Sequence, residues 1–140
     1  MTVEYRFFEH PESLAVRAPF LLPAVGTFTS VVGHGAFGDL FLRDVSTGEY
    51  AILVTATLEV VDTGETDEQG FRELLANPDV GRTLLRPADA DAIARRVGLL
   101  DQGEVFLPVP LRALGGSGEL DTYQRGGLWE YVSIATQSLP

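Results

Sequence analysis

Two apolar runs separated by a short polar connection constrain the fold of this chain more than any other feature of its sequence. The runs are Leu40–Arg43 and Glu49–Val54, and Ser, Thr and Gly occupy the connection between them. These residue types are typical of hairpin turns. Glycines also precede the first run, where they free the backbone, at positions 33, 35 and 38. The pattern predicts a β-hairpin entered through a glycine-rich segment.

Further strands are predicted on both sides of this hairpin. Residues 27–32 are rich in β-branched and aromatic side chains, and residues 57–61 continue the same composition. The chain opens with a strand-like alternation of apolar residues, but three prolines then interrupt it. We therefore expect residues 27–61 to form a mostly antiparallel sheet and residues 1–26 to form an irregular amino-terminal segment.

Two short amphipathic helices are predicted in the middle of the chain. A capping box that begins at Thr66, together with a proline at position 78, places the first helix at residues 66–76. Pro87 at the start and a glycine at the end place the second helix at residues 87–97. We expect both helices to pack on one face of the sheet.

The last third of the chain predicts a return to strands. Glu104–Val109 fits a short strand, and the prolines and glycines that follow it predict a loop. Leu128–Ile134 is the last apolar run. If this run is extended, Trp129 and Tyr131 lie on one face of a strand. The tail of the run fits a short helix equally well. Strands, then helices, then strands describe an α+β fold, in one domain that spans residues 1–140.

Composition narrows the chemistry that is available. The chain has no cysteine, which excludes disulfides, thiolate nucleophiles and zinc sites that use sulfur. Its formal net charge of -10 disfavours nucleic-acid binding, because such binding depends on neutralising phosphates, and favours a basic partner. No apolar run approaches about 18 residues and no leader sequence is recognisable. We therefore expect a cytoplasmic protein without a membrane segment.

Residues 33–38 match the glycine pattern G-x-G-x-x-G of dinucleotide-binding sites, and Glu59 follows at about the distance of the ribose-binding acid. Such a site needs a helix that begins at the third glycine and directs its amides at the pyrophosphate. Here Gly38 precedes a predicted strand instead. We interpret the segment as a turn at the sheet edge and assign no cofactor.

Catalytic and metal chemistry has little support in the sequence. Two histidines without a recognisable ligand spacing do not build a metal site, and Gly115–Glu119 does not fit the nucleophile pattern G-x-S-x-G. The acid–base alternative is a small-molecule enzyme that uses His34 with Asp39, Asp44 or Glu49, which would have to converge in a deep pocket. We assign no catalytic or metal-binding residue and expect a protein that is not an enzyme.

The negative charge is concentrated in one stretch. Between residues 59 and 79 there are seven acids and a single base, Arg72, which gives a local net charge of -6. Such a run is often only a solvated helix start with its preceding loop. A surface of this kind also speeds the capture of a basic protein by electrostatic steering. We therefore predict partner-binding residues in this stretch, namely Asp62, Glu65, Asp67 and Glu68.

Three segments, Gly33–Arg43, Pro110–Gly116 and Tyr131–Gln137, resemble in this order the immunity proteins of type VI secretion systems. More narrowly, they are similar to the carboxy-terminal domain of immunity proteins against DNase toxins, formerly a domain of unknown function. The likeness spans residues 27–140.

The resemblance implies a non-catalytic binding protein that neutralises an antibacterial toxin, such as a nuclease, delivered by a neighbouring cell. It also implies a set of positions that determine the fold rather than contact the toxin: Gly38, Asp39, Pro110, Gly115, Gly116 and Gln137. Intracellular regulatory or scaffold domains of the SMI1-like kind share the same α+β character. The sequence does not separate these two functions.

Overall fold

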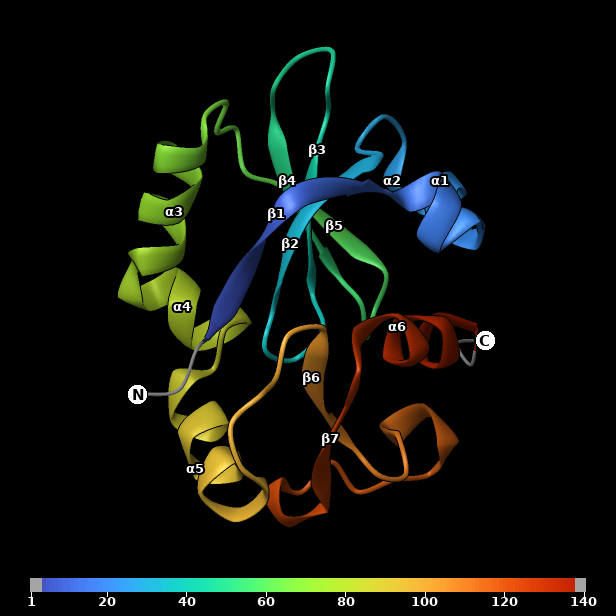
Figure 1. Ribbon diagram of the computed structural model, residues 1–140, viewed down its shortest axis with the longest axis vertical. Coiled ribbons are helices and arrows are strands. Elements are labelled where there is room, and N and C mark those ends of the chain that lie inside the picture. The colour runs from blue at the N-terminus through green and yellow to red at the C-terminus, as the bar shows by residue number, and fades with distance from the viewer. Residues whose placement is uncertain (1–3, 138–140) are drawn as a thin grey trace.

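The computed structural model describes residues 4–137. Within them, five strands form one antiparallel sheet in chain order: β1 (Tyr5–Ser13), β2 (Ser30–Gly35), β3 (Leu40–Arg43), β4 (Tyr50–Val54) and β5 (Glu59–Asp62). A second antiparallel sheet pairs β6 (Glu104–Pro108) with β7 (Tyr123–Gly127). In Figure 1 this second sheet lies beneath the end of the first at which β2 turns into β3. The predicted α+β fold with a mostly antiparallel sheet is confirmed.

The helices of the described residues are short. They are α1 (Leu14–Arg17), α2 (Leu22–Val25), α3 (Glu68–Ala76), α4 (Pro78–Leu84), α5 (Pro87–Val97) and α6 (Leu128–Gln137), with 3-10 turns at Pro19–Leu21, Arg112–Leu114 and Leu120–Thr122. Helix α5 has the bounds that its terminal proline and glycine predict, because proline fits the first turn and Gly98 adopts a positive φ at the end.

The predicted hairpin is formed by β3 and β4, which pair from Leu40 with Leu53 to Arg43 with Tyr50. Asp44 holds the turn between them. Its carboxylate accepts hydrogen bonds from the Ser46 hydroxyl at 2.7 Å and from the Thr27 hydroxyl at 2.7 Å. These bonds to the ionised form lower the pKa of Asp44 to about 2.

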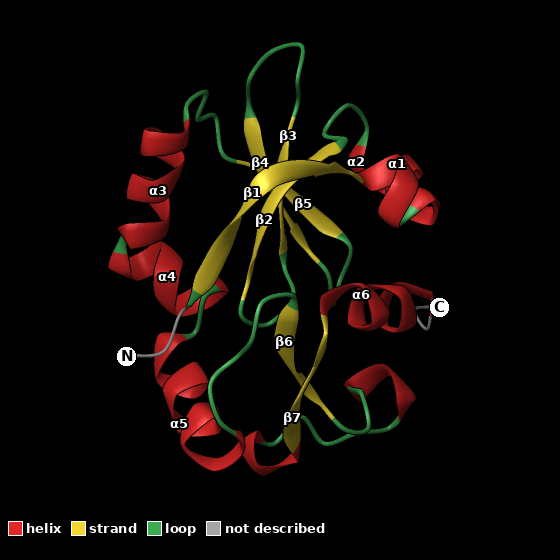
Figure 2. Cartoon of the chain, in the orientation of Figure 1, coloured by secondary structure: helices red, strands yellow, loops and turns green. Residues whose placement is uncertain are grey.

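Both faces of the five-stranded sheet are buried, because successive side chains of a strand point to opposite faces. Leu40 and Leu42 belong to the core that includes α1, α2 and α6, whereas Phe41 belongs to the core that includes α3. Helices therefore lie on both sides of the sheet, as Figure 2 shows. Of the two predicted helices, α3 packs on a face of this sheet as expected, whereas α5 packs against the second sheet. Burial on both faces also explains why the strands read as continuous apolar runs rather than as alternating ones.

Residues 5–25 lie largely in regular elements, which corrects the expectation of an irregular segment at residues 1–26. Residues 5–13 form β1 and pair with β2, with a register shift between Phe7 and Glu12 that spans Pro11. Proline lacks an amide donor, but β1 is an edge strand, where a bulge and a missing donor are tolerated. Val3, which belongs to the predicted alternation, lies outside the described residues.

Helix α3 begins one position later than the capping box at Thr66 predicts. Asp67 is extended and is the N-cap; its carboxylate accepts a hydrogen bond from the Gly70 N–H at 2.6 Å. Aspartate is as favourable an N-cap as threonine, so the local pattern alone does not decide between them. Pro78 follows the end of α3 as predicted, but it also occupies the first turn of α4, which the sequence did not predict.

The last apolar run is a helix, α6, and not a strand. Its buried residues Leu128, Tyr131, Val132 and Ala135 follow helical spacing, which places Trp129 and Tyr131 on different sides. The strand of this region is β7, immediately before the helix. It was not predicted because its sequence, Tyr-Gln-Arg-Gly-Gly, lacks apolar alternation.

Candidate functional site

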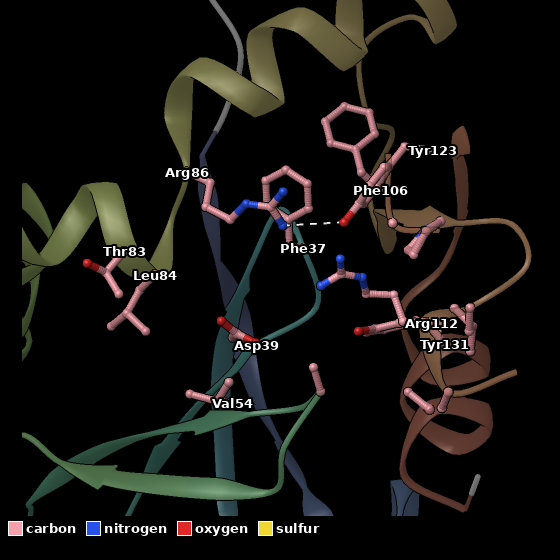
Figure 3. Close-up of a pocket in the computed structure, with 16 residues that line it drawn as sticks. Phe37, Asp39, Val54, Thr83, Leu84, Arg86, Phe106, Arg112, Tyr123 and Tyr131 are labelled. Carbon is pink, nitrogen blue, oxygen red and sulfur yellow. Dashed lines mark hydrogen bonds between the residues drawn. The ribbon is translucent and has the colours of Figure 1, made fainter. Parts of the chain in front are cut away.

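A cavity of about 470 Å³ lies where the two sheets meet α6, and we call it the inter-sheet pocket. Its walls come from the β2–β3 turn, the α4–α5 junction, the β6–β7 sheet, the loop after β6, and α6. The charged and phenolic side chains that line it are Asp39, Arg86, Arg112, Tyr123 and Tyr131, and Figure 3 shows them. The three segments that carry the family resemblance contribute Asp39, Arg112 and Tyr131, so distant parts of the sequence meet here.

Arg86 is held rigidly at one side of the pocket. It adopts left-handed backbone angles, φ 49° and ψ 58°, directly before Pro87, where proline disfavours the right-handed helical conformation of the preceding residue. Its guanidinium lies 4.1 Å from the Phe37 ring centre. Its Nε donates to the Asp89 carboxylate at 3.0 Å and its Nη1 donates to the Tyr123 hydroxyl at 3.4 Å, the dashed line in Figure 3.

Arg112 lines the opposite side of the pocket from an exposed position. Its Nη2 donates to the carbonyl oxygen of Ser117 at 3.3 Å. Gly118 has a φ of 73°, and a side chain there would collide with the Arg112 side chain, so this glycine makes room for the arginine. Among residues 4–137, no carboxylate lies within ion-pair distance of Arg112.

Asp39 brings a carboxyl group to the same pocket. Its Oδ1 accepts a hydrogen bond from the Thr55 N–H at 3.2 Å. Burial disfavours the ionised form and raises the pKa of Asp39 to about 6. Burial, with the nearby charge of Asp39, also raises the pKa of Tyr131 to about 12. The Tyr131 ring packs against Gly38, whose φ of 91° and lack of a side chain bring the β2–β3 turn close to α6.

The other positions assigned to the fold surround the loop after β6. Pro110 follows a cis peptide bond, and Gly115 has a φ of 95°. A side chain on Gly116 would collide with the carbonyl oxygen of Pro110. Gln137 is exposed at the end of α6 and donates to the Ser133 hydroxyl at 2.8 Å.

The structure does not bring His34 together with the three acids considered for acid–base chemistry. His34 is buried beside Phe8 and lines a separate cavity of about 680 Å³ next to β1. Its Nδ1 contacts the carbonyl oxygen of Gly35 at 2.8 Å, and burial lowers its pKa. Asp39 and Asp44 flank β3 at its two ends, and Glu49 lies at the start of β4 beside Asp62.

The predicted partner-binding acids lie between the end of β5 and the first turn of α3, and three of them have local roles. Asp62 accepts from the Gly64 N–H at 3.0 Å, Asp67 caps α3, and Glu68 pairs with Arg72 at 3.1 Å. The β3–β4 turn lies against this loop and adds Glu49, whose pKa is raised chiefly by the charge of Asp62. We call Glu49, Asp62, Glu65, Asp67 and Glu68 the acidic surface.

The glycine-rich segment forms a turn between antiparallel strands. Gly38 precedes β3, and no helix begins there. The geometry therefore agrees with the turn interpretation of the G-x-G-x-x-G pattern. In residues 4–137, no group of three or more metal-ligating side chains is arranged around a common point. No helix in that range combines the length and apolar character needed to cross a membrane.

Sequence reasoning missed Arg86, Tyr123 and the pocket role of Arg112. Arg86 could have been noticed as an arginine directly before the proline that starts a helix, but this pattern has no functional meaning by itself. Arg112 appeared only as part of a resembling segment. These side chains meet through tertiary contacts between residues that are tens of positions apart.

Comparison with known proteins identifies a related fold. A scan against protein-family models finds no match, and a search of curated proteins finds none. Among solved structures, the chain is similar to the crystal structure of Atu4351 from Agrobacterium tumefaciens, with a TM-score of 0.66 and 15% identity. The alignment covers 98% of this chain and 68% of that chain. At this identity the likeness concerns the fold alone.

Proposed function

We propose that this protein is a non-catalytic, cytoplasmic binding protein of the immunity type, which neutralises a secreted antibacterial toxin such as a nuclease. The proposal joins two independent supports. One is the order of the three sequence segments that resemble type VI secretion immunity proteins. The other is the acidic surface, which has the charge expected of a docking site for a basic protein.

The observation that carries the proposal is the grouping of carboxylates from two chain segments on the acidic surface. Glu49 directly precedes β4 and Asp62 ends β5, and the Tyr50 N–H donates to the Glu65 carbonyl oxygen at 2.8 Å. The charge of Asp62 raises the pKa of Glu49. Held together in water, two carboxylates repel each other. A basic partner would relieve that repulsion on docking, and nucleases carry basic surfaces because they bind phosphates.

The test uses surface plasmon resonance at low and high salt. It measures how fast this chain binds the purified protein that is encoded by the neighbouring gene. Four amide substitutions, Asp62→Asn, Glu65→Gln, Asp67→Asn and Glu68→Gln, remove charge and keep the hydrogen-bond acceptors that cap α3 and hold the loop. We expect the association rate at low salt to fall about tenfold, and its salt dependence to weaken, because exposed charges act chiefly on encounter.

The matched control removes the same charge elsewhere, with Asp91→Asn, Asp101→Asn, Glu119→Gln and Asp121→Asn on α5 and on loops around the second sheet. The control should bind at the unaltered rate. Equal rates for both quadruple variants would exclude the acidic surface as the docking site. Expression of the chain should also rescue growth of cells that produce the neighbouring protein. Capture without rescue would favour the regulatory, SMI1-like function instead.

A further inference from the structure

The inter-sheet pocket combines features that the proposed docking function does not use. Two guanidinium groups reach into it from opposite sides, as Figure 3 shows. The protein carries a net charge of -10, yet among the described residues the charged side chains that line this cavity are two arginines and one aspartate. Two cations that face one cavity repel each other unless an anion lies between them.

We propose that the inter-sheet pocket binds a small organic anion, with its carboxylate or phosphate group between Arg86 and Arg112 and its apolar body against the rings that line the cavity. This inference goes beyond the proposed function and does not depend on it. Asp89 already pairs with Arg86, so a ligand with one negative charge would balance Arg112 when Asp39 is protonated.

The arginines suit this task because the planar guanidinium presents paired donors to carboxylate or phosphate oxygens. Arg86 is preorganised: its backbone angles, its stacking on Phe37 and its bond to Asp89 fix the group before any ligand arrives. Arg112 has only a carbonyl oxygen as its hydrogen-bond acceptor within residues 4–137. The guanidinium of Arg86 is thus fixed in place, and the guanidinium of Arg112 retains N–H donors for a ligand.

The remaining walls favour an apolar body on the ligand. Phe37, Phe106, Pro108 and Leu111 line the pocket and are buried. A volume of about 470 Å³ is within the range of small-ligand sites. The hydroxyl group of Tyr131 has no hydrogen-bond partner that the described residues supply, so it is a further donor for the anionic group. The chemistry selects an aromatic or aliphatic carboxylate or a phosphate monoester.

The test titrates the intact protein with three probes and follows binding by NMR shifts of the Gly118 amide and the arginine Nε–H groups. The probes are phenylacetate, phenyl phosphate and the neutral phenylacetamide. We expect dissociation constants on the order of 0.1–1 mM for the anions. The tighter of the two anions identifies the anionic group that the pocket prefers, and either preference supports the site.

Arg112→Gln should weaken binding of the anions about tenfold, because it removes a charge-assisted contact from an exposed side chain that the fold does not need. Arg112→Lys should recover part of the affinity. Arg95→Gln is the control, because Arg95 is exposed on α5 and does not line the pocket. Arg86→Gln should weaken binding of the anions as much as Arg112→Gln does. Urea unfolding shows whether the Arg86→Gln variant retains its fold.

The pH dependence of phenylacetate affinity is an independent measurement. Phenylacetate stays ionised above about pH 5.5, so an increase in its affinity as the pH falls from about 7.5 reports protonation of Asp39. The other charged or phenolic groups that line the pocket with Asp39 are Arg86, Arg112, Tyr123 and Tyr131. Asp39→Asn should abolish the pH dependence. The proposal is overturned if phenylacetamide binds as tightly as phenylacetate, or if Arg112→Gln and Arg95→Gln bind the anions equally.

Discussion

Two aspartates that flank strand β3 illustrate how strongly the environment sets the properties of a residue. Asp44 receives hydrogen bonds from two hydroxyl groups, and its pKa falls to about 2. Asp39 is buried beside one backbone N–H donor, and its pKa rises to about 6. The first arrangement stabilises the ionised group, whereas the second penalises it. At neutral pH, ionised Asp44 therefore stabilises the hairpin, whereas ionised Asp39 destabilises the folded state.

The first prediction concerns Asp39→Asn, which should raise the free energy of unfolding near pH 7.5 by about 1–3 kcal/mol. The folded pKa, about 6, exceeds the ordinary value of 3.8, so the folded state holds the proton more tightly than the unfolded state. Stability therefore falls as the pH rises through this window, and the penalty is complete above it. Asparagine keeps the acceptor for the Thr55 N–H without the charge.

Urea unfolding of both proteins near pH 7.5 and near pH 4 checks this prediction. Near pH 4 the increase in the free energy of unfolding caused by Asp39→Asn should be much smaller than near pH 7.5, because Asp39 is already neutral in the folded state. Asp39→Ala is the control, since it removes the charge and the acceptor together and leaves the Thr55 N–H unpaired. A gain of equal size at both pH values would contradict the account.

Among the secondary-structure elements, α3 links the acidic surface to the core. Phe71 and Leu75 on one side of the helix are buried against the sheet, and Tyr50 stacks on Phe71 with ring centres 5.0 Å apart. On the exposed side, Arg72 lies over the Phe7 ring and pairs with Glu68. The helix is therefore held by packing, and its start is fixed by the Asp67 cap.

The second prediction separates the two candidate caps of α3. Asp67→Ala should lower the free energy of unfolding by about 1 kcal/mol, because the Gly70 N–H loses its acceptor. Thr66→Ala should have an effect below about 0.5 kcal/mol, because Thr66 is exposed and precedes the cap. Urea denaturation of both variants measures the difference, with Asp67→Asn as a variant that retains the cap. If Thr66→Ala lowered the free energy of unfolding more than Asp67→Ala did, Thr66 and not Asp67 would be the N-cap.

At the scale of the whole molecule, an excess of acids acts against the compact state. The chain has 20 acids and ten bases, and like charges come close together on the acidic surface. Self-repulsion of this kind is long-ranged at low ionic strength and is screened within about 10 Å at 0.1 M salt. The stability of the protein should therefore depend on salt through this surface.

The third prediction is that Glu49→Gln raises the melting temperature at neutral pH and low salt. The charge of Asp62 raises the folded pKa of Glu49 above 4.5, so ionised Glu49 destabilises the folded state once the pH exceeds that pKa. The gain should diminish in high salt, because exposed charges are screened. Thermal unfolding at two salt concentrations tests this, with Glu119→Gln as the control. A gain that is independent of salt would mean that repulsion is not its cause.

Features that depend on near neighbours along the chain could be predicted from the sequence. The hairpin of β3 and β4, the bounds of α5 and the α+β class follow from apolar periodicity, turn residues and a proline–glycine pair, all of which act within a few positions. The concentration of acids was also visible, because charge is additive along the chain. The choice between helix and strand stayed open for the last apolar run, which forms α6, because such a run fits either until its burial is known. Strand β7 was missed because its sequence lacks apolar alternation.

Which side chains share a site depends on how the elements pack, and no local pattern predicts it. Asp39, Arg86 and Arg112 lie tens of residues apart, and no periodicity connects them. They meet because the β2–β3 turn passes close to α6 at Gly38, and because the second sheet docks there through the hydrogen bond from the Phe106 N–H to the Ala36 carbonyl oxygen, 2.8 Å long. Local patterns specify elements, whereas the pocket is a property of how those elements pack together.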